Sequence, residues 1–194
     1  PPVTGAPELL PELREHLQPC RNQVLMTSPL PGIKSLKVGG LSVDDGAREL
    51  YLIKRPDGRV CVGGARALEA RAAVGSTDDS SLSEAVGAHL RRFLTESFPN
   101  LGFESGMVEA EWTGVLGFTP DGRPLCGPVP GRSNVIVAAG FCGHGMPQCF
   151  GVGKNVALMV DDLLRGGAVD LDAIPGIDSY IRGPANVARF FRQE

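Results

Sequence analysis

A strand, a glycine-rich turn and a helix follow one another between residues 135 and 164, and this segment is the one best suited to chemistry. The small and β-branched run 134–139 predicts a strand buried on both faces, which is typical of a parallel sheet. The glycine-rich segment 140–153 then leads into a helix predicted over 154–164. Such a turn aims the N–H groups and partial positive charge of a helix N-terminus at a ligand, and its glycines let a flat or anionic group come close. A tight strand-to-helix connection without any ligand explains the same spacing.

Three side chains within that segment could take part in a reaction or bind a metal: Cys142, His144 and Cys149. His144 could transfer a proton, but a histidine in a turn most simply forms hydrogen bonds with the backbone. The three side chains lack a fourth ligand at a useful spacing, so we expect no metal site. Gly151 and Gly153 form a G-x-G pattern that does not directly follow a strand, so it indicates dinucleotide binding only weakly.

Other elements must hold this segment in place. Three short apolar and β-branched runs predict strands at 23–27, 49–54 and 59–64. The turn at 55–58 reads Arg-Pro-Asp-Gly, with proline set for the second turn position and glycine suited to a positive φ. Strand, turn and strand in this order predict a β-hairpin.

Apolar residues recur every three to four positions from Leu82 to Leu94 and predict an amphipathic helix that ends near Pro99. The N-cap is expected at one of three polar residues, Asp79, Ser80 or Ser81. A strand is expected over 107–113, and it contains Trp112, the single tryptophan of the chain. Core packing is the simpler interpretation of Trp112, and a place in the wall of a substrate site is the alternative.

Several short motifs stand in a fixed order along the chain. They are Pro19-Cys20-Arg21-Asn22-Gln23, the hairpin 50–64 that ends in Gly-Gly, Trp112-Thr113-Gly114, the block 117–124 that reads G-F-T-P-D-G-R-P, and the segment 140–146 that reads G-F-C-G-H-G-M. In this order they resemble FAD-dependent oxidoreductases of the D-amino-acid oxidase, glycine oxidase and sarcosine oxidase type. Each motif is short, but together they cover most of residues 19–165.

The resemblance implies a fold class between α+β and α/β: a substrate-domain mixed β-sheet with helices, followed by the last strand–helix unit of a Rossmann-like FAD-binding domain. Residues 1–18 would form a linker or helical lead-in, 19–111 the substrate-binding domain, 112–167 the C-terminal part of the FAD-binding domain and 168–194 a C-terminal tail. The family's N-terminal half, with its G-x-G-x-x-G unit, has no match in this sequence. We therefore expect a fragment, a nicked product or one of two chains that share a fold, with the missing half as its partner.

The resemblance also implies FAD as a noncovalent cofactor, because the position of the family's covalent flavin cysteine falls near Gly114. The residues that would line the flavin are Gly117, Phe118, Thr119, Pro120, Gly140, Phe141, Gly143, His144, Gly145 and Met146. The implied reaction removes a hydride from the C–N bond of an amine or amino acid and gives an imine that hydrolyses. His144 is the candidate catalytic residue.

Two positions depart from the family's usual anchors for a substrate carboxylate. Pro147 stands where sarcosine oxidase-like members have a lysine, and Leu116 stands where glycine oxidase-like members have an arginine. Either the substrate lacks a carboxylate or another cation, such as Arg21 or Arg66, binds it. The expected substrate-binding residues are Arg21, Tyr51, Leu116 and Pro147.

Composition excludes several other classes of protein. The chain has 194 residues, of which 42% are hydrophobic and 21% charged, and these fractions are ordinary for a folded protein. Its net charge of -3 gives no basic excess for nucleic-acid binding, and no run of 18 apolar residues could cross a membrane. The five cysteines form no C-x-x-C pair, which favours free thiols and an intracellular location over a disulfide framework.

Two other hypotheses stay open at this point. The missing G-x-G-x-x-G unit favours a noncatalytic remnant of the fold that serves as a structural or interaction subunit. A different small-ligand enzyme could use the 134–164 unit as an anion site. The retained G-F-C-G-H-G-M turn favours the oxidoreductase, since a scaffold does not require such glycines.

Overall fold

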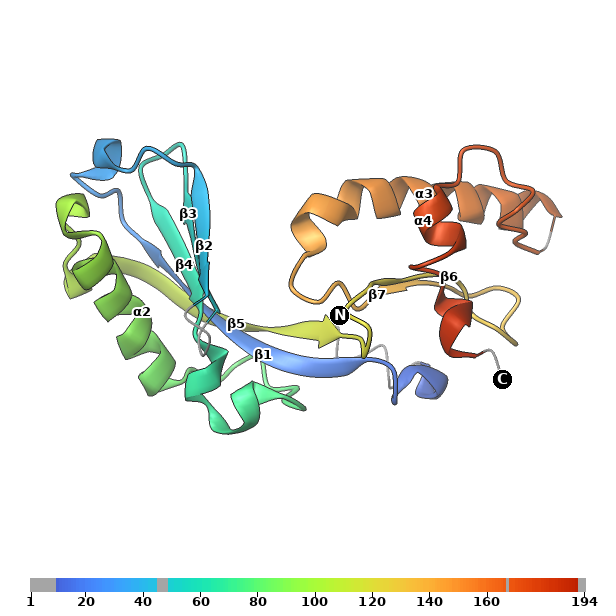
Figure 1. Ribbon diagram of the computed structural model, residues 1–194, viewed down its shortest axis with the longest axis horizontal. Helices are drawn as coiled ribbons and strands as arrows, with labels where there is room; N and C mark the ends of the chain where they lie inside the picture. Colours follow the sequence, from blue (N-terminus) through green and yellow to red (C-terminus); the bar gives the residue numbers. More distant parts are fainter. Residues whose placement is uncertain (1–9, 45–48, 167, 192–194) are drawn as a thin grey trace. The chain divides into compact units, whose positions relative to one another are not determined.

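The computed structural model describes residues 10–44, 49–166 and 168–191. The chain divides into two units. The sheet unit is Cys20–Val115, and the turn unit combines Pro1–Pro19 with Leu116–Glu194. Figure 1 labels the helices and strands of both units.

The sheet unit is built on five strands in the order β2-β3-β4-β1-β5. The strands are β1 (Gln18–Thr27), β2 (Gly40–Asp44), β3 (Glu49–Lys54), β4 (Val60–Gly64) and β5 (Val108–Phe118). The pairs β1–β4, β2–β3 and β3–β4 all run antiparallel. These three pairs correct the expectation of a mixed sheet, and the short turn between β3 and β4 requires antiparallel pairing because parallel neighbours need long crossovers.

The predicted hairpin is confirmed by β3, β4 and the turn between them. Gly58 has a φ of +85°, and its N–H donates to the carbonyl of Arg55 at 3.1 Å. The N–H of Arg55 donates across the turn to the carbonyl of Arg59 at 2.9 Å. Gly64 lies opposite Leu50 in the register of this hairpin.

Helix α2 (Glu84–Ser97) buries Val86, Leu90 and Leu94 in the core of the sheet unit. Their partners come mainly from the strands and include Leu25, Leu50, Leu52, Val60 and Val62. The N-cap is Ser83, whose hydroxyl accepts from the N–H of Val86, so the expected cap at residues 79–81 is wrong. The carboxylate of Asp78 explains this, because it accepts the N–H groups of residues 80 and 81 and holds them in a loop.

The turn unit contains a two-stranded antiparallel sheet of β6 (Leu125–Pro128) and β7 (Ile136–Ala139). Helices α3 (Gly145–Gly166) and α4 (Ser179–Arg182) lie together beside these strands (Figure 1). Their core includes Cys126, Val152, Met159, Ile174, Ile177, Ile181 and Ala185. The shorter 3-10 helices of the chain are Pro11–Leu13, Ile33–Ser35, Arg66–Leu68, Ala70–Ala73, Pro99–Leu101, Ser105–Met107 and Val187–Phe190.

Two expectations for the turn unit need correction. The strand at 136–139 exists, but it pairs antiparallel with β6, and Val137 is its one buried residue, so burial on both faces is wrong. Helix α3 begins at Gly145 rather than at Lys154, because Pro147 is tolerated in a first helical turn and the helix continues through the later glycines. The G-x-G pattern at 151–153 therefore lies inside a helix.

The expected domain boundaries stay predictions. The units divide the chain at residues 20 and 115, close to the expected limits of 19 and 111. The lead-in contains the 3-10 helix Pro11–Leu13, while residues 1–9 lie outside the described residues. The segment expected to be a tail contributes buried side chains to the turn unit, among them Ile174, Ile177, Ile181, Ala185 and Val187.

Candidate functional site

The chain passes from β7 into α3 through residues 140–144, here named the α3-entry turn. Its φ angles are +67° at Gly140, +52° at Cys142 and +81° at Gly143. Left-handed backbone suits glycine, and a Cβ on Gly140 would lie 2.7 Å from Cγ2 of Thr119. Glycine at position 140 therefore allows the turn to approach Thr119 closely.

Cys142 joins the α3-entry turn to the segment that starts at Gly117. The N–H of Cys142 donates to the carbonyl of Gly117 at 2.9 Å. Its buried Sγ accepts from the N–H of Thr119 at 3.4 Å and donates to the carbonyl of Gly140 at 3.2 Å. The structure thus brings together the segments 117–120 and 140–146, which the resemblance assigns to the flavin.

The role of Cys142 was missed by the sequence analysis. A small side chain with a weak donor and acceptor, placed between Gly140 and Gly143, is the signal that could have indicated it. Its partner Thr119 lies 23 residues away in the sequence, and no local pattern predicts that pairing.

Helix α3 presents an open N-terminus. Gly143 and His144 are exposed, and a Cβ on Gly143 would meet no atom within 4 Å. The first N–H groups of a helix have no acceptor within the helix and carry partial positive charge. α3, which is described throughout, has no acidic residue in its first turn to neutralise that charge. The helix end can therefore stabilise negative charge on a bound group.

His144 is held by the backbone of the same turn. Its N–H donates to the carbonyl of Phe141 at 2.8 Å, and its Nδ1 lies 2.9 Å from the carbonyl oxygen of Cys142. Since a carbonyl only accepts, Nδ1 carries the proton in this contact. The simpler interpretation of a turn histidine fits this geometry, and a role in proton transfer stays a prediction.

The Pro-Asp-Gly turn (residues 119–122) follows Gly117 and is held by two hydrogen bonds of Thr119. The N–H of Gly122 donates to the carbonyl of Thr119 at 3.2 Å, and the Thr119 hydroxyl donates to the carbonyl of Arg123 at 2.7 Å. The guanidinium of Arg189 lies 2.8 Å from Asp121, and this hydrogen bond lowers the pKa of Asp121 to about 2. Asp121 is therefore a fixed carboxylate at neutral pH.

The residues expected to line the flavin differ in their exposure. Gly117, Thr119 and Gly140 are buried; Phe118, Phe141 and Gly145 are half-buried; Pro120, Gly143, His144 and Met146 are exposed. The exposed members lie at the tips of the two turns and at the start of α3. A ligand can therefore reach the tips, while the buried members fix the backbone behind them.

The candidate cations of the sheet unit are already paired. Arg21 lies 2.6 Å from Glu69 and 2.9 Å from Asp78, and its hydrogen bond to Glu69 raises the pKa of Arg21. Arg66, the alternative, lies 2.6 Å from Glu49. A substrate carboxylate would have to compete with these protein carboxylates for either arginine.

Tyr51 lies on the face of the sheet opposite α2, because its neighbours Leu50 and Leu52 point into the α2 core. Its hydroxyl accepts from Nδ2 of Asn22 at 3.3 Å, and burial raises the pKa of Tyr51. A Cβ on Gly63 would overlap the Tyr51 hydroxyl, so the glycine leaves room for the ring. In the contacts of the described part of the chain, the Tyr51 hydroxyl accepts this hydrogen bond and donates none.

Leu116 and Pro147 offer no charge to a substrate. Leu116 is half-buried on β5, and Pro147 is exposed in the first turn of α3. Trp112 is 41% exposed on β5, one of the two edge strands of the described sheet, so its interpretation as a core residue is wrong. A place for Trp112 in the wall of a substrate site stays a prediction.

A buried amide within α3 was also missed. Asn155 is 1% exposed, and its Nδ2 donates to the carbonyl of Gly151 at 2.7 Å and to the carboxylate of Asp178 at 2.6 Å. Its Oδ1 accepts the N–H of Asp178 at 2.8 Å. The available signal was a polar residue on the same helix face as Val152 and Met159. This amide attaches the C-terminal segment, residues 168–191, to α3.

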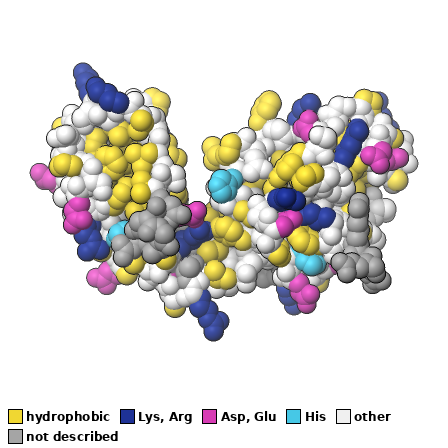
Figure 2. Space-filling view, in the orientation of Figure 1, with side chains coloured by type: hydrophobic (Ala, Val, Ile, Leu, Met, Phe, Trp, Pro, Cys, Tyr) yellow, Lys and Arg dark blue, Asp and Glu magenta, His cyan; other side chains and the backbone are white. Residues whose placement is uncertain are grey.

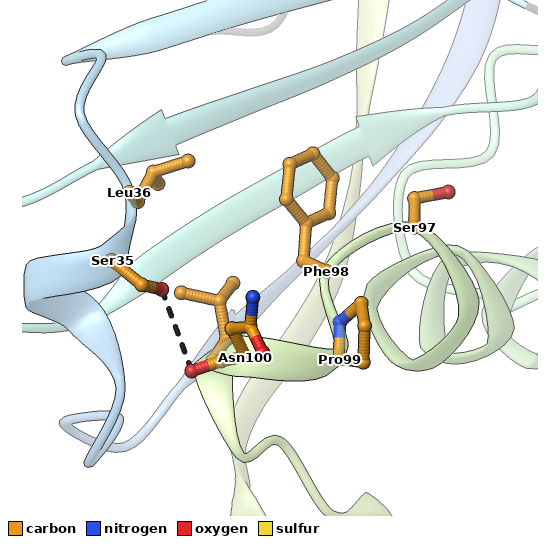
Figure 3. A pocket seen from close by; sticks show the side chains of 7 residues that line it. Ser35, Leu36, Ser97, Phe98, Pro99 and Asn100 are labelled. Atoms are coloured by element: carbon orange, nitrogen blue, oxygen red, sulfur yellow. Dashed lines mark hydrogen bonds between the residues drawn. The ribbon is translucent and has the colours of Figure 1, made fainter.

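A small pocket lies elsewhere, at the C-terminal end of α2 (Figure 3). Its volume is about 130 Å³, and it is lined by Ser35, Leu36, Ser97, Phe98, Pro99, Asn100 and Leu101. The Ser35 hydroxyl donates to the carbonyl of Asn100 at 3.4 Å within it. None of its lining residues is a candidate from the sequence, and all of them belong to the sheet unit.

The described residues offer neither a metal-binding group nor a helix that could span a membrane. Within residues 10–44, 49–166 and 168–191, no three His, Cys, Asp or Glu side chains form a group that could hold a metal ion. No helix in that same part of the chain is both long and apolar enough to cross a membrane.

The five-stranded sheet unit and the strand–turn–helix unit, whose helix N-terminus is open, place this chain in the α+β class of folds. Within that class, the family model described as FAD dependent oxidoreductase matches residues 4–159, so this chain belongs to that family. FAD is the cofactor of the family, and the resemblance drawn from the motifs is confirmed.

Individual relatives agree with this assignment. A protein of Rhizobium meliloti (strain 1021), named "Probable oxidoreductase OrdL", is 32% identical over 86% of this chain and 35% of its own length. Glycine oxidase from Geobacillus kaustophilus has a TM-score of 0.59 at 22% identity, over 95% of this chain and 42% of its own. L-proline dehydrogenase from P. horikoshii has a TM-score of 0.56 at 20% identity, over 90% and 42%. The solved structures show the fold, and the chain spans well under half of each relative.

Proposed function

We propose that this chain is part of a FAD-dependent oxidoreductase that oxidises the C–N bond of an amine or amino acid. The α3-entry turn would face the flavin ring, which is bound noncovalently. The observation that carries the proposal is the link through Cys142, which holds the segment after Gly117 against the turn that opens α3. Cys142 itself has a φ of +52°, a conformation that costs a non-glycine residue about 1 kcal/mol and occurs preferentially at functional sites.

The residues present fit one edge of a flavin ring. Gly143 leaves open space where a side chain would stand, and the first N–H groups of α3 lie beside it. FAD, when bound, supplies the hydride acceptor. The glycines of the α3-entry turn would let the backbone lie close to the ring, and the two linked turns would orient it. The N-terminus of α3 would stabilise negative charge on the ring. The G-x-G-x-x-G unit for the ADP half has no match here, so that half must be held by other residues.

Amines are the proposed substrates. The names glycine oxidase, L-proline dehydrogenase and fructosyl amine:oxygen oxidoreductase belong to proteins of this fold that act on amines or amino acids, which supports the class. Leu116 and Pro147 replace the family's charged anchors, and Arg21 is already paired with carboxylates. An amine without a free carboxylate fits this set better than an amino acid. Tyr51, with a hydroxyl proton to donate, is the proposed polar contact.

The proposed partner is the remaining part of the family fold. Helix α3 buries Val152 and Met159 on one face, while Met146, Phe150 and Leu164 are 87%, 88% and 81% exposed on the other. A helix that is apolar on opposite faces belongs between two layers of a protein. Figure 2 shows hydrophobic side chains at the surface of the turn unit. Because this chain spans only 35–42% of its relatives, the rest of such a fold is the partner that would cover α3.

The test combines absorbance with mass analysis. The chain is purified from its natural source, everything that copurifies is identified by intact mass, and the two absorption bands of oxidised flavin are recorded. We expect a second polypeptide segment and bound FAD. Anaerobic addition of a panel of amines and amino acids should then bleach the flavin bands.

Variants make the test specific to the site. His144→Glu places a negative charge at the start of α3 and should weaken FAD binding at least tenfold. Lys154→Glu places the same charge on the exposed surface of the same helix and should not. A single species without flavin would contradict the proposal and favour the noncatalytic remnant. Bound flavin that no amine reduces would contradict the C–N chemistry alone.

A further inference from the structure

Arg189, in the C-terminal segment 168–191, uses all of its hydrogen-bond donors. Its Nε and one terminal nitrogen bind the two oxygens of Asp121 at 2.8 and 3.0 Å. The same terminal nitrogen also donates to the carbonyl of Arg123 at 2.9 Å, and the other terminal nitrogen donates to the carbonyls of Pro124 and Asn186, both at 3.1 Å. An arginine has five N–H donors in a rigid fork, and five oxygen atoms accept them here.

Aromatic contacts hold the same end of the segment. The guanidinium carbon of Arg189 lies 4.4 Å from the ring centre of Phe190, which is the geometry of a cation–π contact. The ring of His16 stacks on Phe190 at 4.6 Å between ring centres. The guanidinium is therefore fixed by its ring contact as well as by its acceptors, and its side chain is only 16% exposed.

The acceptors of Arg189 belong to the Pro-Asp-Gly turn and the residues directly after it. Asp121 is two residues from Thr119, whose N–H and hydroxyl lie 3.4 and 3.3 Å from Sγ of Cys142. Cys142 belongs to the α3-entry turn. A continuous set of contacts therefore runs from Arg189 through Asp121 and Thr119 to the start of α3.

The C-terminal segment is attached to the turn unit at two further points. The N–H of Cys126 on β6 donates to the carbonyl of Ala185 at 2.8 Å. Asp178 exchanges hydrogen bonds with the buried amide of Asn155 in α3. The segment thus holds β6, α3 and the Pro-Asp-Gly turn together, although it lies beyond residue 159, where the match to the family model ends.

We propose that Arg189 is a positioning residue for the flavin: it fixes the Pro-Asp-Gly turn and, through Thr119 and Cys142, the α3-entry turn against the ring. This inference rests on the proposed function for the identity of the bound group. The fork of an arginine is required, because a lysine could keep the charge pair with Asp121 but could not reach all the carbonyls at once.

The experiment compares Arg189→Lys with Arg165→Lys. Arg165 also pairs with an aspartate of the turn unit, Asp161, but its side chain is 77% exposed. Amide hydrogen exchange of the chain without FAD is followed by mass spectrometry over residues 117–126 and 140–146, with α2 as the internal reference. The visible circular dichroism of FAD bound to the complete holoenzyme is the second measurement.

Arg189→Lys should speed exchange over both stretches about tenfold and alter the circular dichroism of bound FAD, since losing bonds from a charged donor weakens local structure by about that factor. Arg165→Lys should change neither. Unchanged exchange in Arg189→Lys would overturn the inference. Faster exchange with an unaltered FAD signal would also overturn it and leave Arg189 a purely structural role. A wild-type protein that binds no FAD would contradict the proposed function, while the exchange data still decide whether Arg189 holds the turns.

Discussion

The substitution Gly64→Ala should lower the free energy of unfolding of the sheet unit more than an alanine substitution at an open glycine of the same sheet. Gly64 ends β4 with a φ of +112°, which a residue with a side chain rarely adopts. Its Cβ would overlap the carbonyl oxygen of Glu49 and lie 2.9 Å from the carbonyl carbon. That oxygen already accepts the N–H of Ala65 at 2.7 Å. The added Cβ would therefore collide with a hydrogen-bonded backbone carbonyl, which cannot rotate away as a flexible side chain could.

The size of the effect follows from these contacts. The left-handed conformation costs a side chain about 1–2 kcal/mol. To relieve the overlap, β3 must move away from β4, and losing the bond between Ala65 and Glu49 costs about 1–2 kcal/mol more. Gly64→Ala should therefore lower the free energy of unfolding by about 3 kcal/mol, a large share of the stability of an ordinary domain.

Urea unfolding followed by fluorescence measures this loss, because Trp112, the single tryptophan, lies in the same unit. The control is Gly114→Ala on β5, where a Cβ would meet no atom within 4 Å, and its effect should stay below about 1 kcal/mol. An equal effect of the two substitutions would refute the argument, since it would mean that the sheet absorbs the overlap without cost.

Three further predictions concern single side chains. Ser83→Ala should destabilise α2 by about 1 kcal/mol in urea unfolding, whereas Asp79→Ala should have little effect. Asn155→Ala should cost about 2 kcal/mol, seen as an earlier unfolding transition by circular dichroism, because it removes the buried amide. Burial raises the pKa of the Cys126 thiol to about 11, so alkylation at pH 8 should modify the exposed Cys149 and spare Cys126; equal labelling, read by peptide mass, would contradict this.

The elements that the sequence predicted best are those specified by neighbouring residues. The hairpin at 49–64 needs only two β-branched runs and a Pro-Asp-Gly turn, and it was predicted nearly to the residue. The start of α3 was misplaced by nine residues, because a run rich in glycine reads as a loop even when packing makes it helical. Ser83 was missed as the N-cap because Asp78, six residues before the start of α2, binds the N–H groups of the competing residues 80 and 81.

The site was predictable only in part, because some of its contacts join neighbouring residues and others join residues far apart in the sequence. The two glycines of the α3-entry turn, Gly140 and Gly143, lie three residues apart, so their spacing indicated the turn directly. The contacts that support it join residues far apart: Cys142 with Thr119, and Arg189 with Asp121, which are separated by 23 and 68 residues. Side-chain hydrogen bonds over such separations leave no periodic signal, so a structure was needed to find them.

The distribution of charge supports the proposal that the turn unit, rather than the arginines of the sheet unit, meets the flavin. Arg21, Arg66 and Arg91 each lie within 2.9 Å of a carboxylate of the same unit, so their charges are largely compensated. The first turn of α3 holds no acidic residue, and its partial positive charge stays open to a ligand. Charge that develops on a reduced flavin would therefore be stabilised by backbone N–H groups, whose position is set by Cys142 and the turn before it rather than by a mobile side chain.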